Sequence, residues 1–378
     1  MSNDYPVVLV HGLLGWGRDE LGRYPYWGTA RSVPSPLRRR EASVGPLSSY
    51  HDRACELAWQ LHGGTVDYGQ DHSDRAGHRR YGRTYNTPLV GAWSSTSPVH
   101  LVGHSMGAPT SWLLQQLLEE DYFGWVSSAG WIKSVTSISG VLNGSTATYF
   151  FGVDELTGLL DQDSAAGWLG QALEVSIRAT GGIFESAYDF DLDHWGLEQA
   201  PGEELAGFVE RVGAAQLLLG YDNAAHSLSI QGTEKLTQYA HTFPNSYYLS
   251  YITEQTFAGY FSGHHYPEPL MNPILIPSAL WMGHKEFDVE FYDGFNSSDW
   301  WHNDGAVSTY SQQSPRIGGH HPVGGSMDTT PLEPGRWYHE TLTSTDHLDI
   351  AMKPQLGKVG EQKRFYTNLF QQLAELPA

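Results

Sequence analysis

The motif Gly-His-Ser-Met-Gly at residues 103–107 is the sequence feature that most restricts how this chain can fold. An apolar run, residues 99–103, leads into it, and residues 106–120 follow with apolar side chains at helical spacing. A G-x-S-x-G motif between a strand and a helix is typical of a sharp turn that projects the serine from the sheet edge. The helix that begins there directs backbone N–H groups at the serine, which favours a developing oxyanion. We therefore interpret Ser105 as a candidate nucleophile rather than as part of an ordinary glycine-flanked turn.

Apolar runs and helical patterns alternate along the rest of the chain. Strands are predicted at residues 7–10, 99–103, 132–138 and 247–252, and helices at 51–61, 106–120, 154–179, 203–219 and 363–376. This alternation predicts an α/β fold with a mostly parallel central sheet covered by helices on both faces. Residues 1–378 are expected to form a single domain in which residues 154–219 are a helical insertion. Residues 63–85 are rich in Gly, His, Asp and Arg, so we expect one long functional loop there.

Composition excludes several classes of partner. The 22 basic and 42 acidic side chains give a net charge of −20, which argues against nucleic acid or an anionic membrane surface as a partner. Cys55 is the only cysteine, so no internal disulfide can form. No apolar run approaches the roughly 18 residues of a transmembrane helix. The first residues carry no basic segment or cleavage site of a secretory signal, so we expect a cytoplasmic protein, or a secreted one if a signal has been removed.

A serine nucleophile needs a general base, and the base needs an acidic group to orient it. In the strand–serine–helix architecture these residues occur in the order serine, acid, histidine. His347, shortly before the last predicted helix, lies where that order places the base. Because the chain has 18 histidines, others compete for this role: His284, His302, the pair His264-His265 and the pair His320-His321.

The acid should precede the histidine in the chain. We favour Asp304, in the segment Trp-His-Asn-Asp-Gly at residues 301–305, although Asn-Asp-Gly is also a common turn sequence. Asp293 and Asp346 remain alternatives. Asp346 is less favoured because adjacent side chains in extended backbone point apart, which would direct its carboxylate away from His347.

The negative charge that develops on an attacked carbonyl oxygen needs two N–H donors. One is expected from Met106, the residue after the nucleophile, and the other from the loop after the first strand. His-Gly-Leu-Leu-Gly at residues 11–15 supplies that loop, and Leu13 is the expected donor. The strand before this loop favours the oxyanion role over that of a plain glycine turn.

Short motifs that belong together in one enzyme family are spread along the whole chain. The most distinctive is Gly-Gly-Thr-Val-Asp-Tyr-Gly at residues 63–69. Others are Gly-Trp-Gly-Arg at 15–18, Tyr-Trp-Gly at 26–28, Asp-Arg-Ala-Cys-Glu at 52–56, Gly-Arg-Thr-Tyr at 82–85, Trp-Gly-Leu at 195–197, His-Tyr-Pro-Glu at 265–268 and Asp-His-Leu at 346–348. In these motifs the chain resembles the thermoalkalophilic bacterial lipases, the family that includes the staphylococcal and Geobacillus types.

The resemblance implies an α/β-hydrolase fold in which residues 154–219 form a helical lid over an apolar acyl site. It also implies a catalytic triad of Ser105, Asp304 and His347, the same residues that chain order selects. Ser105 would attack an ester carbonyl and form an acyl-enzyme, while Asp304 would hold the imidazole of His347 as it moves the proton. The implied activity is hydrolysis of a lipid or small-molecule carboxylic ester, with transient contact to a lipid interface.

A structural zinc is a further property of the family, and its ligands correspond here to Asp52, His72, His78 and Asp222. Two carboxylates and two imidazoles make a closed tetrahedral set with no open position for water, as in structural zinc sites. The ion would tie residues 63–85 and the helical insertion to the core.

The calcium site of the family is matched only in part. Asp349 keeps one acidic ligand, but a further aspartate is replaced around Lys353, which precedes a proline. Leu270 stands at a glycine position that supplies a carbonyl oxygen. A lysine is an unfavourable neighbour for Ca²⁺, so calcium is not expected to bind.

Three other departures from the family bear on the substrate. Met106 stands where glutamine is usual, Leu13 replaces an aromatic residue in the oxyanion loop, and residues 139–145 depart from the family pattern. Only the N–H of Met106 is needed, whereas Leu13 would reshape the acyl pocket. Several alternatives therefore stay open: an intracellular esterase, lactonase or acyltransferase acting on a bulky small molecule, a hydrolase whose zinc activates water, and an inactive binding protein on this fold.

Overall fold

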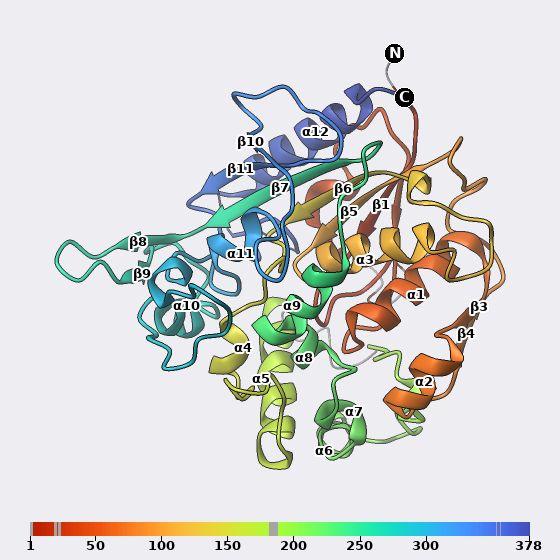
Figure 1. Ribbon diagram of the computed structural model, residues 1–378. Helices are drawn as coiled ribbons and strands as arrows, with labels where there is room; N and C mark the ends of the chain where they lie inside the picture. The colour runs from red at the N-terminus through yellow and green to blue at the C-terminus, as the bar shows by residue number, and fades with distance from the viewer. Residues whose placement is uncertain (1–2, 19–20, 22–23, 181–187, 353, 356) are drawn as a thin grey trace.

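A single parallel sheet organises the chain (Figure 1). The computed structural model describes residues 3–18, 21, 24–180, 188–352, 354–355 and 357–378. The sheet has the order β10-β11-β7-β6-β5-β1-β2, and each neighbouring pair is parallel. Its strands are β1 (Val7–Val10), β2 (Arg39–Glu41), β5 (Val99–His104), β6 (Ile132–Ile138), β7 (Tyr247–Glu254), β10 (Val323–Ser326) and β11 (Trp337–Thr343). The α/β fold with a mostly parallel sheet that the sequence predicts is confirmed.

Helices follow the strands along the chain. They are α1 (Tyr50–His62), α2 (Gln70–Ala76), α3 (Gly107–Glu119), α4 (Ala147–Phe150), α5 (Gln162–Thr180), α6 (Leu205–Gly213), α7 (Gln216–Leu219), α8 (Ala224–Leu228), α9 (Ile230–Tyr239), α10 (Ile276–Met282), α11 (Thr309–Gln313) and α12 (Val359–Glu375). In the described part of the chain, none of these helices combines the length and the apolar character that a bilayer span requires.

Both faces of the sheet are covered by helices (Figure 1). Tyr248 and Tyr251 lie three residues apart on β7, so their side chains point to opposite faces. The Tyr248 hydroxyl donates to Gln115 of α3 at 2.8 Å, while the Tyr251 ring packs against Phe365 of α12 with 5.0 Å between ring centroids. The central strands β1 and β5 are buried along their whole length. The continuous apolar run of β1 is the result of this two-sided burial, while β5 also buries His100 and His104.

Residues 63–85, expected to form one long loop, instead contain β3 (Gly64–Asp67), α2 and β4 (Tyr81–Tyr85). β3 and β4 pair antiparallel, and the hydroxyls of Thr65 and Thr84 lie 2.8 Å apart across the pair. Val66 is the one fully buried residue of β3. The loop prediction was wrong because a surface ribbon of two strands is held by backbone and hydroxyl bonds and needs no alternation of apolar side chains.

The described part of the predicted insertion, residues 154–219, contains three α-helices. The helix pattern at 154–179 corresponds to α5, and the pattern at 203–219 divides into α6 and α7, which pack with α5. Residues 181–187 lie outside the described residues. In Figure 1 these helices lie below the sheet, away from α12, while a hairpin of β8 (Thr256–Ala258) and β9 (His265–Pro267) projects at the left.

Candidate active site and metal centre

Ser105 occupies the sharp connection between β5 and α3, with a φ of 56° in the left-handed region. Two glycines make this connection possible. A Cβ on Gly107 would lie 2.0 Å from the carbonyl oxygen of Val10, and one on Gly103 would lie 2.3 Å from the backbone of Gly107. A non-glycine residue at positive φ stores strain of about 1–3 kcal/mol, which the packed turn imposes on the serine.

The serine lies at an apolar cavity of about 130 Å³ that His347 also lines. Leu13, from the loop after β1, contributes to its wall, and α5 contributes Trp168 and Ala172. The helix α5 therefore contributes apolar side chains to the wall of the cavity at which the serine lies. Apolar walls around a few polar groups are typical of small-molecule and lipid sites.

Asp304 and His347 are brought together by the fold, with 2.8 Å between Asp304 Oδ2 and His347 Nδ1. Asp304 is fully buried in the loop before α11. Its carboxylate also accepts hydrogen bonds from the N–H groups of Ala306 and Val307, the hydroxyl of Thr253 and the side-chain amide of Gln312. Because a carboxylate oxygen accepts, Nδ1 of the neutral imidazole carries the hydrogen and Nε2 presents a lone pair. This is the geometry that a general base needs.

The alternative acids and bases contact other groups. Asp346 accepts the backbone N–H groups of Leu348 and Asp349, and burial together with the charge of Asp349 raises its pKa to about 6. Asp293 is exposed to solvent. Competing histidines have partners elsewhere: His302 with Glu254, His284 with the carbonyl of Leu280, and His321 with the carbonyl of Thr237. The cavity wall formed by described residues contains none of these alternatives.

The two residues predicted to donate to an oxyanion reach the serine from different segments. Met106 follows Ser105 directly and is buried, whereas Leu13 lines the cavity from the loop after β1. No acceptor among the described residues receives the backbone N–H of either residue. Two N–H groups without partners beside a serine are what an oxyanion hole requires. Their role in catalysis stays a prediction.

Two residues that sequence analysis did not single out connect the parts of this site. Nε2 of His104 lies 3.1 Å from the carbonyl oxygen of His347, and Nδ1 lies 2.7 Å from the Tyr26 hydroxyl. A carbonyl oxygen only accepts, so Nε2 carries the hydrogen and Nδ1 accepts from Tyr26. The Tyr26 oxygen in turn accepts the N–H of Gly12 at 2.9 Å.

This network depends on a neutral imidazole. Burial, followed by the nearby imidazole of His347, lowers the pKa of His104 well below its ordinary value. The neutral ring therefore links the loop that carries His347, the serine turn and the loop of Gly12. The position of His104 inside the G-x-S-x-G motif was the available sequence signal, whereas nothing local to Tyr26 indicated its contact.

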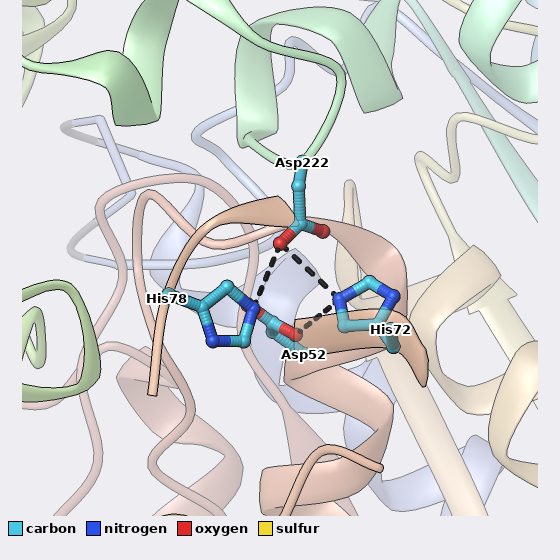
Figure 2. A group of neighbouring side chains, drawn as sticks. All are labelled: Asp52, His72, His78 and Asp222. Carbon is cyan, nitrogen blue, oxygen red and sulfur yellow. Dashed lines mark hydrogen bonds and ion pairs between the residues drawn. The ribbon is translucent and has the colours of Figure 1, made fainter. Parts of the chain in front are cut away.

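Asp52, His72, His78 and Asp222 meet at one point (Figure 2). They come from α1, from α2, from the residues after α2 and from the loop before α8. Nε2 of His72 lies 3.1 Å from Asp52 Oδ1 and 3.2 Å from Asp222 Oδ2. Nε2 of His78 lies 3.2 Å from Asp222 Oδ2 and 3.6 Å from Asp52 Oδ2. A tetrahedron with metal–ligand bonds of about 2.0–2.1 Å has edges of about 3.3–3.4 Å, so this set could hold a divalent metal ion.

The ring of His78 provides a test of that fit. Its Nδ1 donates to the carbonyl oxygen of Arg79 at 2.8 Å, so Nε2 of the neutral ring presents its lone pair to the two carboxylates. Nε2 is buried, and the groups that face it are the two carboxylates. Burial would lower the pKa of His78, but the carboxylates of Asp222 and Asp52 raise it. The position therefore favours a positive charge, either a divalent cation bound to the lone pair or, without one, a proton on Nε2. The residues present therefore fit a metal ion.

Residues around this centre include one that sequence analysis missed. Nε2 of His194, in the 3-10 helix η4 (Asp193–Trp195), lies 3.2 Å from Asp52 Oδ2. Burial would raise the pKa of Asp52, but hydrogen bonds from His194, His51 and His72 outweigh burial and hold that pKa well below its ordinary value. An ionised Asp52 is thus favoured. His194 adjoins the Trp-Gly-Leu motif at residues 195–197, which was the only signal for it.

The segment in which the sequence departs from the calcium site of the family is held by amide and ammonium donors. Asp349 Oδ2 lies 3.7 Å from Lys358 Nζ, and Asp349 Oδ1 accepts the backbone N–H of Gln355 at 3.3 Å. The Gln355 side chain donates to the carbonyl oxygen of Leu270 at 2.7 Å. Lys353 lies outside the described residues. The absence of calcium stays a prediction.

A parallel sheet with helices on both faces, a strained serine between strand and helix, and a histidine paired with an aspartate define an α/β-hydrolase. Within that class, the sequence model of the family described as "Lipase-like, C-terminal domain" matches residues 3–376. The chain belongs to this family, and the staphylococcal-type resemblance noted in the sequence is confirmed.

Individual relatives agree with this assignment. Lipase 2 of Staphylococcus aureus strain MSSA476 is 30% identical over 408 residues, which cover 100% of this chain and 55% of that protein. The chain therefore spans about half the length of the curated relatives it matches. Among solved structures, EstA of Clostridium botulinum has a TM-score of 0.81 at 33% identity, covering 99% of this chain and 88% of that one. Lipase 1 of Pelosinus fermentans has a TM-score of 0.80 at 32% identity, covering 100% of each chain.

Proposed function

We propose that this chain is a lipase-like carboxylic ester hydrolase that forms an acyl-enzyme on Ser105. The observation that carries the proposal is the placement of Ser105, at a φ of 56°, in an apolar cavity that His347 also lines, with His347 bonded to Asp304 at 2.8 Å. A strained serine, an oriented imidazole and a buried carboxylate form the constellation of a serine hydrolase.

In the proposed reaction, Ser105 Oγ attacks the ester carbonyl while His347 Nε2 takes the hydroxyl proton. Asp304 holds Nδ1–H, so Nε2 is the nitrogen available as base. The N–H groups of Leu13 and Met106 stabilise the oxyanion. His347 then passes the proton to the departing alcohol, and water, activated by the same imidazole, releases the acid from Ser105.

The substrate is proposed to be an ester with an apolar acyl chain. The walls of the cavity are formed largely by aliphatic and aromatic side chains, among them Trp168 and Ala172 of α5. Because side chains of α5 form part of the cavity wall, we assign this helix the role of a lid that moves before a bulky ester enters. Relatives named as lipases favour a lipid ester over a small polar one.

The metal centre is proposed to hold a structural zinc. Asp52, His72, His78 and Asp222 would supply all four positions of a tetrahedral ion, which leaves none for substrate or water. When bound, the ion supplies charge neutralisation for the two carboxylates and a cross-link between α1, α2 and the loop before α8. It takes no part in the proposed ester chemistry.

A fluorophosphonate probe is expected to label the native protein at a single residue, Ser105, because only an activated serine reacts with such phosphorus electrophiles at an appreciable rate. Mass spectrometry of the labelled peptide identifies the site. Heat-denatured protein is the control and should remain unlabelled. An unlabelled native protein, or a label on another serine, would contradict the proposed function.

Removal of zinc is expected to reduce stability more than activity. At a free zinc concentration near 100 times Kd, binding adds about 3 kcal/mol to the free energy of unfolding. Slow chelation should therefore lower Tm by several degrees. The initial rate on a p-nitrophenyl ester, measured before unfolding, should change less than about twofold, since no ligand position faces the substrate. Added zinc should restore Tm. A lost rate at unchanged Tm would instead support a zinc-catalysed hydrolase.

A further inference from the structure

We propose that Glu254, His265 and His302 form a second metal site, separate from the centre in Figure 2, that binds a divalent transition metal such as Zn²⁺. Each residue offers one ligand atom, and these atoms lie within 4.8 Å of one another. Nδ1 of His302 is 2.8 Å from Glu254 Oε1, and the ring centroids of His265 and His302 are 3.6 Å apart. The three groups thus converge from three different segments of the chain.

The backbone around the cluster holds these segments in place. Glu254 ends β7, His265 begins β9, and His302 follows the 3-10 helix η5 (Ser297–Trp300). Next to Glu254, Gln255 donates its backbone N–H to the carbonyl of Asn303 at 3.2 Å, and its own carbonyl accepts from Glu268 at 3.0 Å. The ligands are therefore preorganised by hydrogen bonds that do not depend on the metal.

The ring of His265 is oriented in the way a metal-binding histidine usually is. Its Nδ1 lies 3.1 Å from the Thr256 hydroxyl, which leaves Nε2 for the metal. The Thr256 oxygen also accepts the N–H of Asn303 at 3.2 Å, so this hydroxyl is itself fixed. His265 is buried, whereas the side chain of His302 is 51% exposed. One fixed inner ligand and one adaptable outer ligand allow the cluster to adjust its distances to an ion.

The donor set determines the class of metal. Two imidazoles and one carboxylate favour Zn²⁺, Co²⁺ or Ni²⁺ over Ca²⁺ or Mg²⁺, which take oxygen ligands. Three protein ligands leave a fourth position open to water, unlike the closed set around Asp52. Glu254 and His302 line an open cleft of about 500 Å³, so solvent reaches the site. A simple ion pair between Glu254 and His302 would give no role to the third member of the cluster, the buried residue His265.

The site adjoins the segments that hold the candidate catalytic acid, Asp304, and this position indicates what a bound metal would do. Thr253 precedes Glu254 and donates to Asp304 Oδ2 at 2.7 Å, and His302 is two residues before Asp304. A metal would therefore join the end of β7, the β8–β9 hairpin and the loop of Asp304. We assign it a positioning and stabilising role, with no step of the ester chemistry.

The test measures zinc bound per chain by the full-length protein. After chelation and dialysis against dilute zinc, the wild type is expected to bind two zinc ions, one in each site, and His302→Ala only one. Because His302 is largely exposed, this variant should keep its fold, which circular dichroism checks. With Co²⁺ as the probe, the visible absorption of the second site should disappear in the variant. Thr256→Val should weaken zinc binding at the second site by about 10- to 100-fold.

The matched control is His284→Ala. His284 belongs to the same histidine-rich surface, with its ring 4.8 Å from that of His264, but it is not part of the cluster. It should leave the zinc count unchanged. If His302→Ala binds as much zinc as the wild type, the proposal of a second site is overturned. If only the first site fails to bind zinc, the wild type would hold one ion and His302→Ala none. Failure of the first site and failure of the second site therefore give different results.

Discussion

Replacing Ser105 by alanine is expected to lower kcat for hydrolysis of short p-nitrophenyl esters by about 10⁴- to 10⁶-fold. Without the hydroxyl, His347 has no nucleophile to activate, and only the oxyanion donors and substrate binding remain. Steady-state rates with purified wild type and variant measure the loss. Because the metal centre lies on other elements, zinc content and Tm should stay close to those of the wild type.

A matched control is available in the same cavity. Ser176 lines it from α5 and is also buried, but it lies within that regular helix and has no histidine partner among the described residues. Ser176→Ala should keep kcat within about fivefold of wild type, since it removes a hydroxyl without removing a reacting group. Substantial turnover by Ser105→Ala would remove the serine mechanism and favour the one in which zinc activates water.

The parts of the fold that could be predicted are those where local sequence and burial agree. β1 and β6 coincide with the predicted runs at residues 7–10 and 132–138, because both are buried central strands rich in β-branched residues. The strand β11 was not predicted: it combines Trp337 with His339 and Glu340, and its far end is only partly buried. Near the edge of a sheet, hydrogen bonding to a neighbouring strand decides the structure, and that pairing leaves little trace in the strand's own sequence.

The residues of the candidate site also divide into those that local sequence identifies and those that only the fold brings together. Ser105 could be identified because its motif requires a strand, a glycine turn and a helix, all local features. Asp304 and His347 could be ranked by chain order, but their 2.8 Å contact depends on the whole fold. His194, beside Asp52, and the group of Glu254, His265 and His302 have no diagnostic spacing in the sequence. Contacts between segments so far apart become visible only in three dimensions.

The replacement Asp304→Asn is expected to lower kcat by about 10⁴-fold while leaving the shape of the site intact. Asp304 Oδ1 accepts two backbone N–H groups, from Ala306 and Val307, so an asparagine oxygen is favoured at that position. Its amide would then replace Oδ2 and present a donor to Nδ1 of His347. A donor there stabilises the tautomer with hydrogen on Nε2, which cannot take the proton of Ser105. KM should change little, because the carboxylate does not line the cavity.

Asp346→Asn is the control that separates the two candidate acids. Asp346 adjoins His347 in sequence, but its carboxylate accepts backbone N–H groups of Leu348 and Asp349 instead of the imidazole. Its replacement should therefore keep kcat within about tenfold of wild type, even where Tm changes. Labelling of Ser105 by the fluorophosphonate should slow in parallel with kcat in Asp304→Asn and stay near normal in Asp346→Asn. The reverse ranking of the two variants would assign the orienting role to Asp346, and equal small losses would mean that His347 does not depend on a carboxylate for its tautomer.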